Sequence, residues 1–181
     1  MERDVGGLKR LRGTPMPASS YFIGKAILIA VSMIIQIALL FVFVLLFFGV
    51  EMPTELSKWL TFTWLVLLGS ACSTPLGIAF SIVPKSGRGA SAVVSPIVII
   101  LQFFSGVFFV FTQLPTWMQQ LAAIFPLKWL TQGMRSVFLP DSFATQEVAK
   151  SWETGRTFLI LVLWLVIGIF FSVRKFKWDR D

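Results

Sequence analysis

Histidine is absent from this 181-residue sequence, and cysteine occurs only once, as Cys72. A single cysteine excludes a disulfide within the chain. The four longest apolar runs also contain no Asp or Glu. Intramembrane metalloproteases, aspartyl proteases and phosphotransferases need carboxylates or histidines placed together, and a proton-driven transporter needs a titratable group within a span. The sequence therefore disfavours these classes and predicts no catalytic residue, metal site or cofactor.

A nucleotide-binding motif is missing as well. The stretch SGRGAS (86–91) contains glycines, but it lacks the GxxxxGK[ST] spacing that cradles phosphates. If this chain moves a substrate with ATP as the energy source, the ATPase must therefore be a separate chain.

Hydrophobic residues are abundant: they make up 56% of the chain, with 19 Phe and 7 Trp, and the mean hydropathy is +0.80. This composition predicts an integral membrane protein. Backbone polar groups in hydrocarbon must be paired within helices or a closed barrel, and the apolar runs lack the alternation of barrel strands. We therefore expect an all-α integral membrane protein with a single membrane domain.

The predicted organisation is four transmembrane helices preceded by a short polar helix. Residues 1–20 are polar and basic and place Leu8 and Leu11 on one face of that helix, which ends near Gly13 and Pro15. Spans need about 20 predominantly apolar residues. The predicted spans cover residues 21–50, 59–83, 90–111 and 157–173.

The basic residues predict the orientation. Ten of the 16 Lys and Arg residues lie near the two termini and in the 84–89 loop, and the opposite side carries five that are diluted by acids. By the positive-inside tendency, both termini and this loop are cytoplasmic. The net charge of +7 thus reflects contact with a lipid bilayer, and no nucleic-acid partner is predicted.

Residues 114–138 form a further apolar stretch that prolines divide. Pro115 precedes one short apolar run and Pro126 interrupts it before a second, each too short to cross a bilayer. This pattern is typical of a re-entrant helical hairpin, and the charge pattern puts it on the outer side. An amphipathic loop resting on the membrane surface remains the alternative.

Polar and aromatic side chains in the spans suggest a substrate route. The polar ones could instead bond to their own or a neighbouring helix, which is the commoner role of such groups. The candidates for the route are Gln36, Gln102, Ser105, Phe108 and Phe109.

Two motifs resemble the permeases of the type-2 ATP-binding-cassette transporter family. ERDVGGLKRLRGTPMP (2–17) is similar to that family's E-R-E-x-G-T-L-x-R-L-R-x-T-P-L, with Gly7 where Thr is usual. FFSGVFFVFTQLPTWMQQLAAIFPLKWLTQGMR resembles S-G-x-F-F-P, then L-P-x-W, then P-L-x-Y-x-x-x-x-x-R, with Val110 and Trp129 in place of Pro and Tyr. Residues that match the second pattern are Ser105, Gly106, Phe108, Phe109, Leu114, Pro115, Trp117, Pro126, Leu127 and Arg135.

The resemblance implies roles for both motifs. The first would be a cytoplasmic coupling helix that docks onto the ATPase subunit, although its basic face could instead bind anionic lipid headgroups. The second would be a re-entrant hairpin that caps the outer end of the substrate route. The implied coupling residues are Glu2, Arg3, Leu8, Arg10, Leu11 and Arg12, and the hairpin residues are Pro115, Trp117, Pro126 and Arg135.

Members of this family normally carry an interfacial helix and two spans before the coupling helix. The four spans predicted here would correspond to the third to sixth spans of such a permease, so the resemblance implies a chain that lacks the first two. A split gene, a mis-assigned start or a truncated permease would each account for this.

The expected function is that of a permease subunit of an ATP-binding-cassette exporter in a bacterial plasma membrane. It would pair with a cytoplasmic ATPase subunit, form a homodimer or join a sister permease, and move a hydrophobic or amphipathic drug, antibiotic or lipid outward. The alternatives are a non-transporting membrane scaffold or a truncated remnant of a permease. A compact four-span secondary transporter is disfavoured because the spans lack acidic residues.

Overall fold

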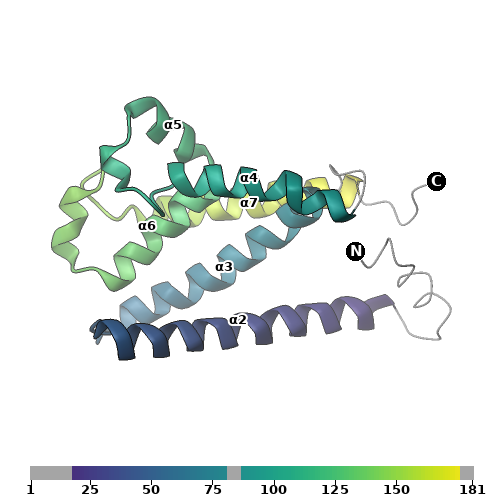
Figure 1. The fold of residues 1–181 in the computed structure, drawn as a ribbon, viewed down its shortest axis with the longest axis horizontal. Coiled ribbons are helices and arrows are strands. Elements are labelled where there is room, and N and C mark those ends of the chain that lie inside the picture. Colours follow the sequence, from purple (N-terminus) through teal and green to yellow (C-terminus); the bar gives the residue numbers. More distant parts are fainter. Residues whose placement is uncertain (1–17, 81–86, 176–181) are drawn as a thin grey trace. The chain divides into compact units, whose positions relative to one another are not determined.

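The computed structural model describes residues 18–80 and 87–175, and the described residues form helices and turns without a β-strand (Figure 1). Two compact units divide the chain, one of residues 1–52 and one of residues 53–181. The all-α class predicted from the sequence is therefore confirmed for the described ranges.

In the described part of the first unit, residues 18–52, the chain forms one long helix, α2 (Ala18–Phe48). Its apolar side chains are exposed along its length, and the window Ile27–Phe48 is long and apolar enough to cross a membrane. The helix ends before Gly49, whose φ of +56° lies in the left-handed region that glycine adopts without strain.

The second unit is built on two parallel helices, α3 (Leu56–Phe80) and α7 (Thr154–Lys175). The ring of Trp64 in α3 packs on that of Phe158 in α7, with centroids 5.7 Å apart. Both helices therefore begin at the same end of the unit. Buried core residues come from both helices and from α6 (Pro126–Phe138), namely Leu65, Leu161 and Val137.

Helix α4 (Gly87–Phe104) ends at Phe104, whereas the third apolar run extends to Phe111. The backbone leaves the helix at Gly106, which has a φ of +79°, and the Val107 N–H bonds to the Gln102 carbonyl. Glycine tolerates this conformation because it has no Cβ. The helix is consequently shorter than the run of apolar residues that predicted the third span.

The proline-divided stretch is a helical hairpin. It consists of the 3-10 turn η1 (Phe111–Gln113), α5 (Thr116–Ile124) and α6. Phe125 is extended between the two helices, and Pro126 occupies the first position of α6, where its missing N–H costs nothing. The chain thus leaves the helical conformation at Phe125, directly before Pro126.

The hairpin folds back along α3 and α7. The turn between α5 and α6 contacts Trp164, whose indole Nε1 donates to the Ile124 carbonyl at 2.7 Å. Because Trp164 follows Thr154 by ten residues, this turn lies about 15 Å along α7 at a rise of about 1.5 Å per residue. The other end of α6 lies at the start of α3, where Lys58 Nζ bonds to the Leu139 carbonyl at 3.3 Å. The hairpin therefore lies alongside α3 and α7, and its re-entrant position in a membrane remains a prediction.

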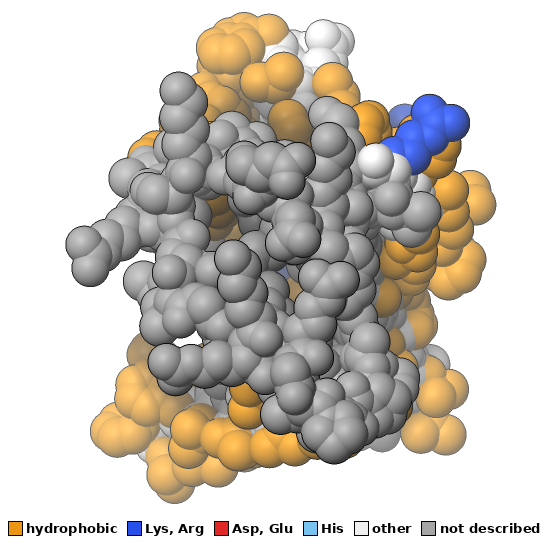
Figure 2. Space-filling view, turned by 90° about the vertical axis from the view of Figure 1, so that its right-hand side faces the viewer, with side chains coloured by type: hydrophobic (Ala, Val, Ile, Leu, Met, Phe, Trp, Pro, Cys, Tyr) orange, Lys and Arg blue, Asp and Glu red, His pale blue; other side chains and the backbone are white. Residues whose placement is uncertain are grey.

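Two helices of the described chain pass a length and composition test for membrane spans, α2 over Ile27–Phe48 and α7 over Thr154–Phe171; a shorter apolar helix covers Val94–Phe104. Many large apolar side chains of α2 and α7 are exposed, as expected for surfaces that contact lipid, and orange apolar side chains are visible around the grey, undescribed atoms in Figure 2. The full four-span topology remains a prediction.

Helices α3 and α6 approach closely at Gly69 in α3 and Gly133 in α6. The contact at Gly133 yields a testable expectation. A Cβ added at Gly133 would lie 2.6 Å from Leu65 Cδ2 and 2.9 Å from Leu65 Cδ1. Leu65 is fully buried and packs in the core with Val137 and Leu161. Gly133→Ala should therefore lower the free energy of unfolding by about 1–2 kcal/mol in a detergent unfolding titration, because overpacking outweighs the gain of about 1 kcal/mol in helix propensity.

The control is Gly155→Ala in α7, where an added Cβ meets no atom within 4 Å. This variant should be at least as stable as the native chain. Leu65→Ala should destabilise the Gly133→Ala chain less than it destabilises the native chain, because the added Cβ fills part of the space that the leucine leaves. A Gly133→Ala chain as stable as the native one would contradict the close helix approach.

Candidate functional site

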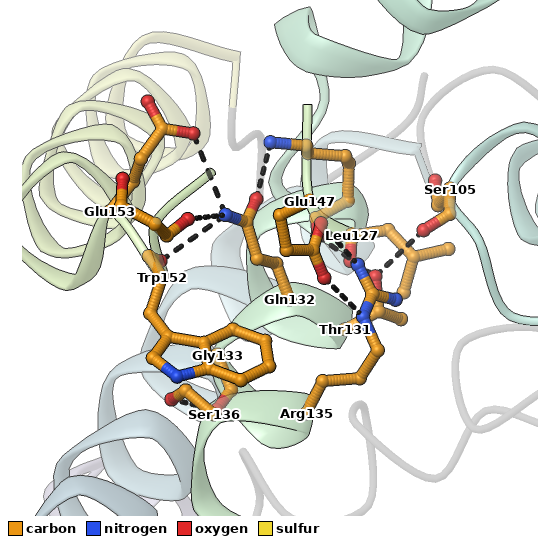
Figure 3. Close-up of polar contacts among 12 residues, drawn as sticks. Ser105, Leu127, Thr131, Gln132, Gly133, Arg135, Ser136, Glu147, Trp152 and Glu153 are labelled. Atoms are coloured by element: carbon orange, nitrogen blue, oxygen red, sulfur yellow. Dashed lines mark hydrogen bonds and ion pairs between the residues drawn. The ribbon is translucent and has the colours of Figure 1, made fainter. Parts of the chain in front are cut away.

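The hairpin helix α6 carries a polar stripe that faces the protein. Lys128, Gln132 and Ser136 are buried although they are polar, and they recur every four residues, so they lie on one face of the helix. Figure 3 shows that this face meets the segment that precedes α7. Buried polar groups must be hydrogen-bonded to be tolerated, so their partners define the site.

Gln132 is the central residue of this contact. Its Nε2 donates to the Ser151 and Trp152 carbonyls at 3.4 and 3.2 Å, and it lies 3.5 Å from Glu153 Oε2 (Figure 3). Its Oε1 accepts a hydrogen bond from Lys128 Nζ. The side-chain amide of Gln132 therefore connects Lys128, in the first turn of α6, with the segment that leads into α7.

Arg135 forms a two-point ion pair with Glu147. The Nε–Oε1 distance is 2.8 Å and the Nη2–Oε2 distance is 3.3 Å. Glu147 follows the 3-10 helix η2 (Asp141–Gln146), and its side chain is only 9% exposed. Two parallel hydrogen bonds between a guanidinium and a carboxylate fix the relative orientation of the two side chains and add to the attraction of their charges. This pair therefore holds η2 against α6.

A third contact joins α6 to the end of α4. The Thr131 hydroxyl donates to the Ser105 carbonyl at 2.7 Å. Ser105 is fully buried, and its own hydroxyl has no hydrogen-bond partner among the described residues. The predicted route residue Ser105 is thus covered by the hairpin.

A hollow of about 340 Å³ lies beside the ion pair. The segment after α4 contributes Phe108 and Phe109 to its wall, and α6 contributes Arg135. The wall is therefore aromatic with one charged pair, a combination suited to amphipathic molecules. The residues that complete it are Gly106, Val107, Val110, Phe111, Thr112, Leu139, Phe143, Gln146, Glu147 and Trp152.

The remaining predicted route residues are only partly brought together. Phe108 and Phe109 lie with their ring centroids 5.0 and 5.6 Å from that of Phe103. Gln102 is half-buried on α4, whereas Gln36 is exposed on α2, in the other unit. Their role in a route remains a prediction.

The predicted hairpin residues have structural positions that suit their chemistry. Pro115 caps α5, Pro126 begins α6, and Trp117 is exposed with its ring edge-on to that of Phe104. The predicted coupling residues Glu2, Arg3, Leu8, Arg10, Leu11 and Arg12 lie outside the described residues.

Sequence reasoning missed Lys128, Gln132, Glu147 and Glu153 as parts of one cluster. The spacing of the α6 residues was a usable signal, because Lys128, Gln132 and Arg135 fall at helical intervals in an otherwise apolar segment. Their acidic partners could not be paired with them, since they come from a loop whose path depends on the fold.

Comparison with protein families gives one match. The model of the ABC-2 type transporter family matches residues 1–139. No curated protein and no solved structure matches the chain. The matched range includes the predicted coupling stretch, α2 to α5 and all of α6. The chain therefore belongs to the ABC-2 type transporter family, whose members are membrane components of ATP-binding-cassette transporters.

Proposed function

We propose that this chain is the permease subunit of an ATP-driven exporter that moves a hydrophobic or amphipathic substrate outward across a bacterial plasma membrane. The observation that carries the proposal is the family match over residues 1–139, which includes both the 2–17 motif and the hairpin. ATP hydrolysis takes place on a separate cytoplasmic subunit, because the sequence has no phosphate-binding motif.

The geometry of the hairpin supports its role as the outer cap of the substrate route. Its turn contacts Trp164, close to the middle of the apolar window Thr154–Phe171 of α7. The polar cluster around Gln132 and Glu147 lies toward the starts of α3 and α7. With the termini in the cytoplasm, as the charge pattern predicts, this end of the unit faces outward.

The mechanism that follows is alternating access. Closure of the ATPase pair pushes on the coupling helix 2–12, the helices tilt, and the substrate passes between two permease copies toward the hairpin. Aromatic walls such as that of Phe108 and Phe109 accept drugs, antibiotics and lipids alike. The second permease copy is either identical or a sister chain.

Purification of the C-terminally tagged chain from its native membrane in mild detergent tests the proposal. Intact mass spectrometry of the retained proteins should detect an ATPase subunit in stoichiometric amount. Reconstitution of that complex in vesicles should then give ATP-dependent export of an amphipathic dye. A chain that is retained alone would instead support a non-transporting scaffold or a remnant.

A further inference from the structure

Lys128 is a cation buried inside the hairpin. The residue is only 5% exposed. Its Nζ bonds to Gln132 Oε1 and lies 3.5 Å from the ring centroid of Trp129 and 5.3 Å from that of Phe111. Aromatic faces and one amide oxygen thus replace the water that a lysine normally holds.

The charges that face Lys128 leave it without a counter-ion. Arg135 is paired with Glu147, and Arg156 with Glu153 at 3.0 Å. Within residues 18–80 and 87–175, no ion pair includes Lys128. The cluster therefore holds three cations against two carboxylates, and the unpaired cation is the most buried of the three.

The position of Lys128 in α6 adds to this imbalance. Phe125 caps the helix and Pro126 is its first residue, so Lys128 lies in the first turn. The free N–H groups of a first turn carry partial positive charge, which disfavours a cation there. Nothing in the local helix geometry therefore compensates the burial of this ammonium group.

Burial lowers the pKa of Lys128 from 10.5 to about 8, although the charges of Glu153 and Glu147 act in the opposite direction; Arg135 and Arg156 lower it further. A pKa lowered by folding means that the packed state disfavours the proton. The packed hairpin should therefore gain stability as pH rises from about 8 toward 10.5, and below about 8 the full cost of the charge is present.

We propose that the buried ammonium of Lys128 is the element that allows the hairpin to open, because its charge is hydrated only when α6 separates from the 147–153 loop. Opening exposes the covered end of the substrate route near Ser105. Removing the charge should hold the hairpin closed.

The loop that α6 would leave is itself strained. Lys150 and Glu153 have φ values of +53° and +46°, in the left-handed region that non-glycine residues adopt at a cost. Gln132 holds this loop through the Ser151 and Trp152 carbonyls. Separation of α6 would break these two hydrogen bonds and leave the loop without its contact to Gln132.

Thiol labelling of the full chain in lipid nanodiscs tests the proposal. Cys72→Ala removes the native thiol, and Ser136→Cys introduces a reporter at a buried position of α6. At pH 7, Lys128→Met should slow the reaction with a membrane-impermeant maleimide about tenfold or more. The ratio of the two rates should fall by about tenfold or more between pH 7 and about pH 9.5, and it should approach one only above about pH 10.5, because the opened Lys128 still takes up a proton below its ordinary pKa. The titration of the reporter thiol cancels in this ratio.

Lys128→Arg is the matched variant, because arginine keeps its charge at alkaline pH. At about pH 9.5, the reporter cysteine in the Lys128→Arg chain should react about tenfold faster than the same cysteine in the chain that keeps the native lysine. Equal rates for Lys128→Met and Lys128 at pH 7, or a faster rate in a Lys128→Met chain with native helical circular dichroism, would overturn the proposal. Should Lys128→Met misfold, the Lys128→Arg comparison decides alone. The consequence for transport rests on the proposed function, whereas labelling needs neither ATP nor substrate, so the two can fail separately.

Discussion

Arg135→Ala should lower the free energy of unfolding by about 3 kcal/mol, because it leaves a carboxylate buried without a partner. The Glu147 side chain is 9% exposed, and its carboxylate accepts two hydrogen bonds from the Arg135 guanidinium. The loss should appear in a denaturant titration in detergent, monitored by circular dichroism. Proteolysis should also increase in the 139–153 segment, since this ion pair ties η2 to α6.

Arg156→Ala is the matched control. Arg156 also pairs with a glutamate, Glu153; the arginine side chain is 65% exposed and the glutamate side chain 16% exposed, so water can replace the arginine and the loss should be closer to the roughly 0–1 kcal/mol of exposed pairs. Glu147→Gln added to Arg135→Ala should recover stability, because it removes the unpaired charge. If Arg135→Ala costs no more than Arg156→Ala, the ion pair is not a structural element of the hairpin.

Leu8→Asp combined with Leu11→Asp should abolish export, with a fall of at least about tenfold, while the chain still inserts into the membrane. The proposed coupling helix 2–12 places both leucines on one face, and an apolar face that docks on a partner cannot accept buried carboxylates. ATP hydrolysis by the retained complex should continue without transport. Dye export and phosphate release, measured on the same vesicles, check both expectations.

Lys9→Asp controls for charge. It lowers the net charge by two units, as does the double leucine substitution, but at about 100° per residue Lys9 lies away from the leucine face. Export should persist in this variant. Loss of export in both would indicate that the basic segment binds anionic headgroups, and unchanged export in the leucine variant would refute the coupling role.

Helix positions in this chain were predictable because their causes are local. The thickness of the bilayer's hydrocarbon core requires long apolar runs. The runs that predicted the first and last spans correspond to α2 and α7. Pro126 removes a backbone donor, so the hairpin breaks where the sequence places it. The end of α4 was predicted less well, because apolar residues continue to Phe111 while the backbone turns at Gly106.

The contacts of the candidate site were not predictable in the same way. Lys128, Gln132 and Arg135 could be placed on one helix, but Glu147 and Glu153 come from a segment that is 12 to 21 residues away in the chain. Their pairing depends on how the 139–153 segment crosses α6. Helical periodicity carries no information about that path.

By itself, the sequence determined that this chain is a helical membrane protein, that a proline divides its hairpin, and that its motifs resemble those of ABC-2 permeases. These properties follow from apolar length, backbone chemistry and residue order. Only the tertiary structure decided that the hairpin folds back to the level of Trp164 and buries Lys128 without a carboxylate partner. The physical reason is that burial and charge pairing depend on distances across the fold, which residues far apart in sequence determine together.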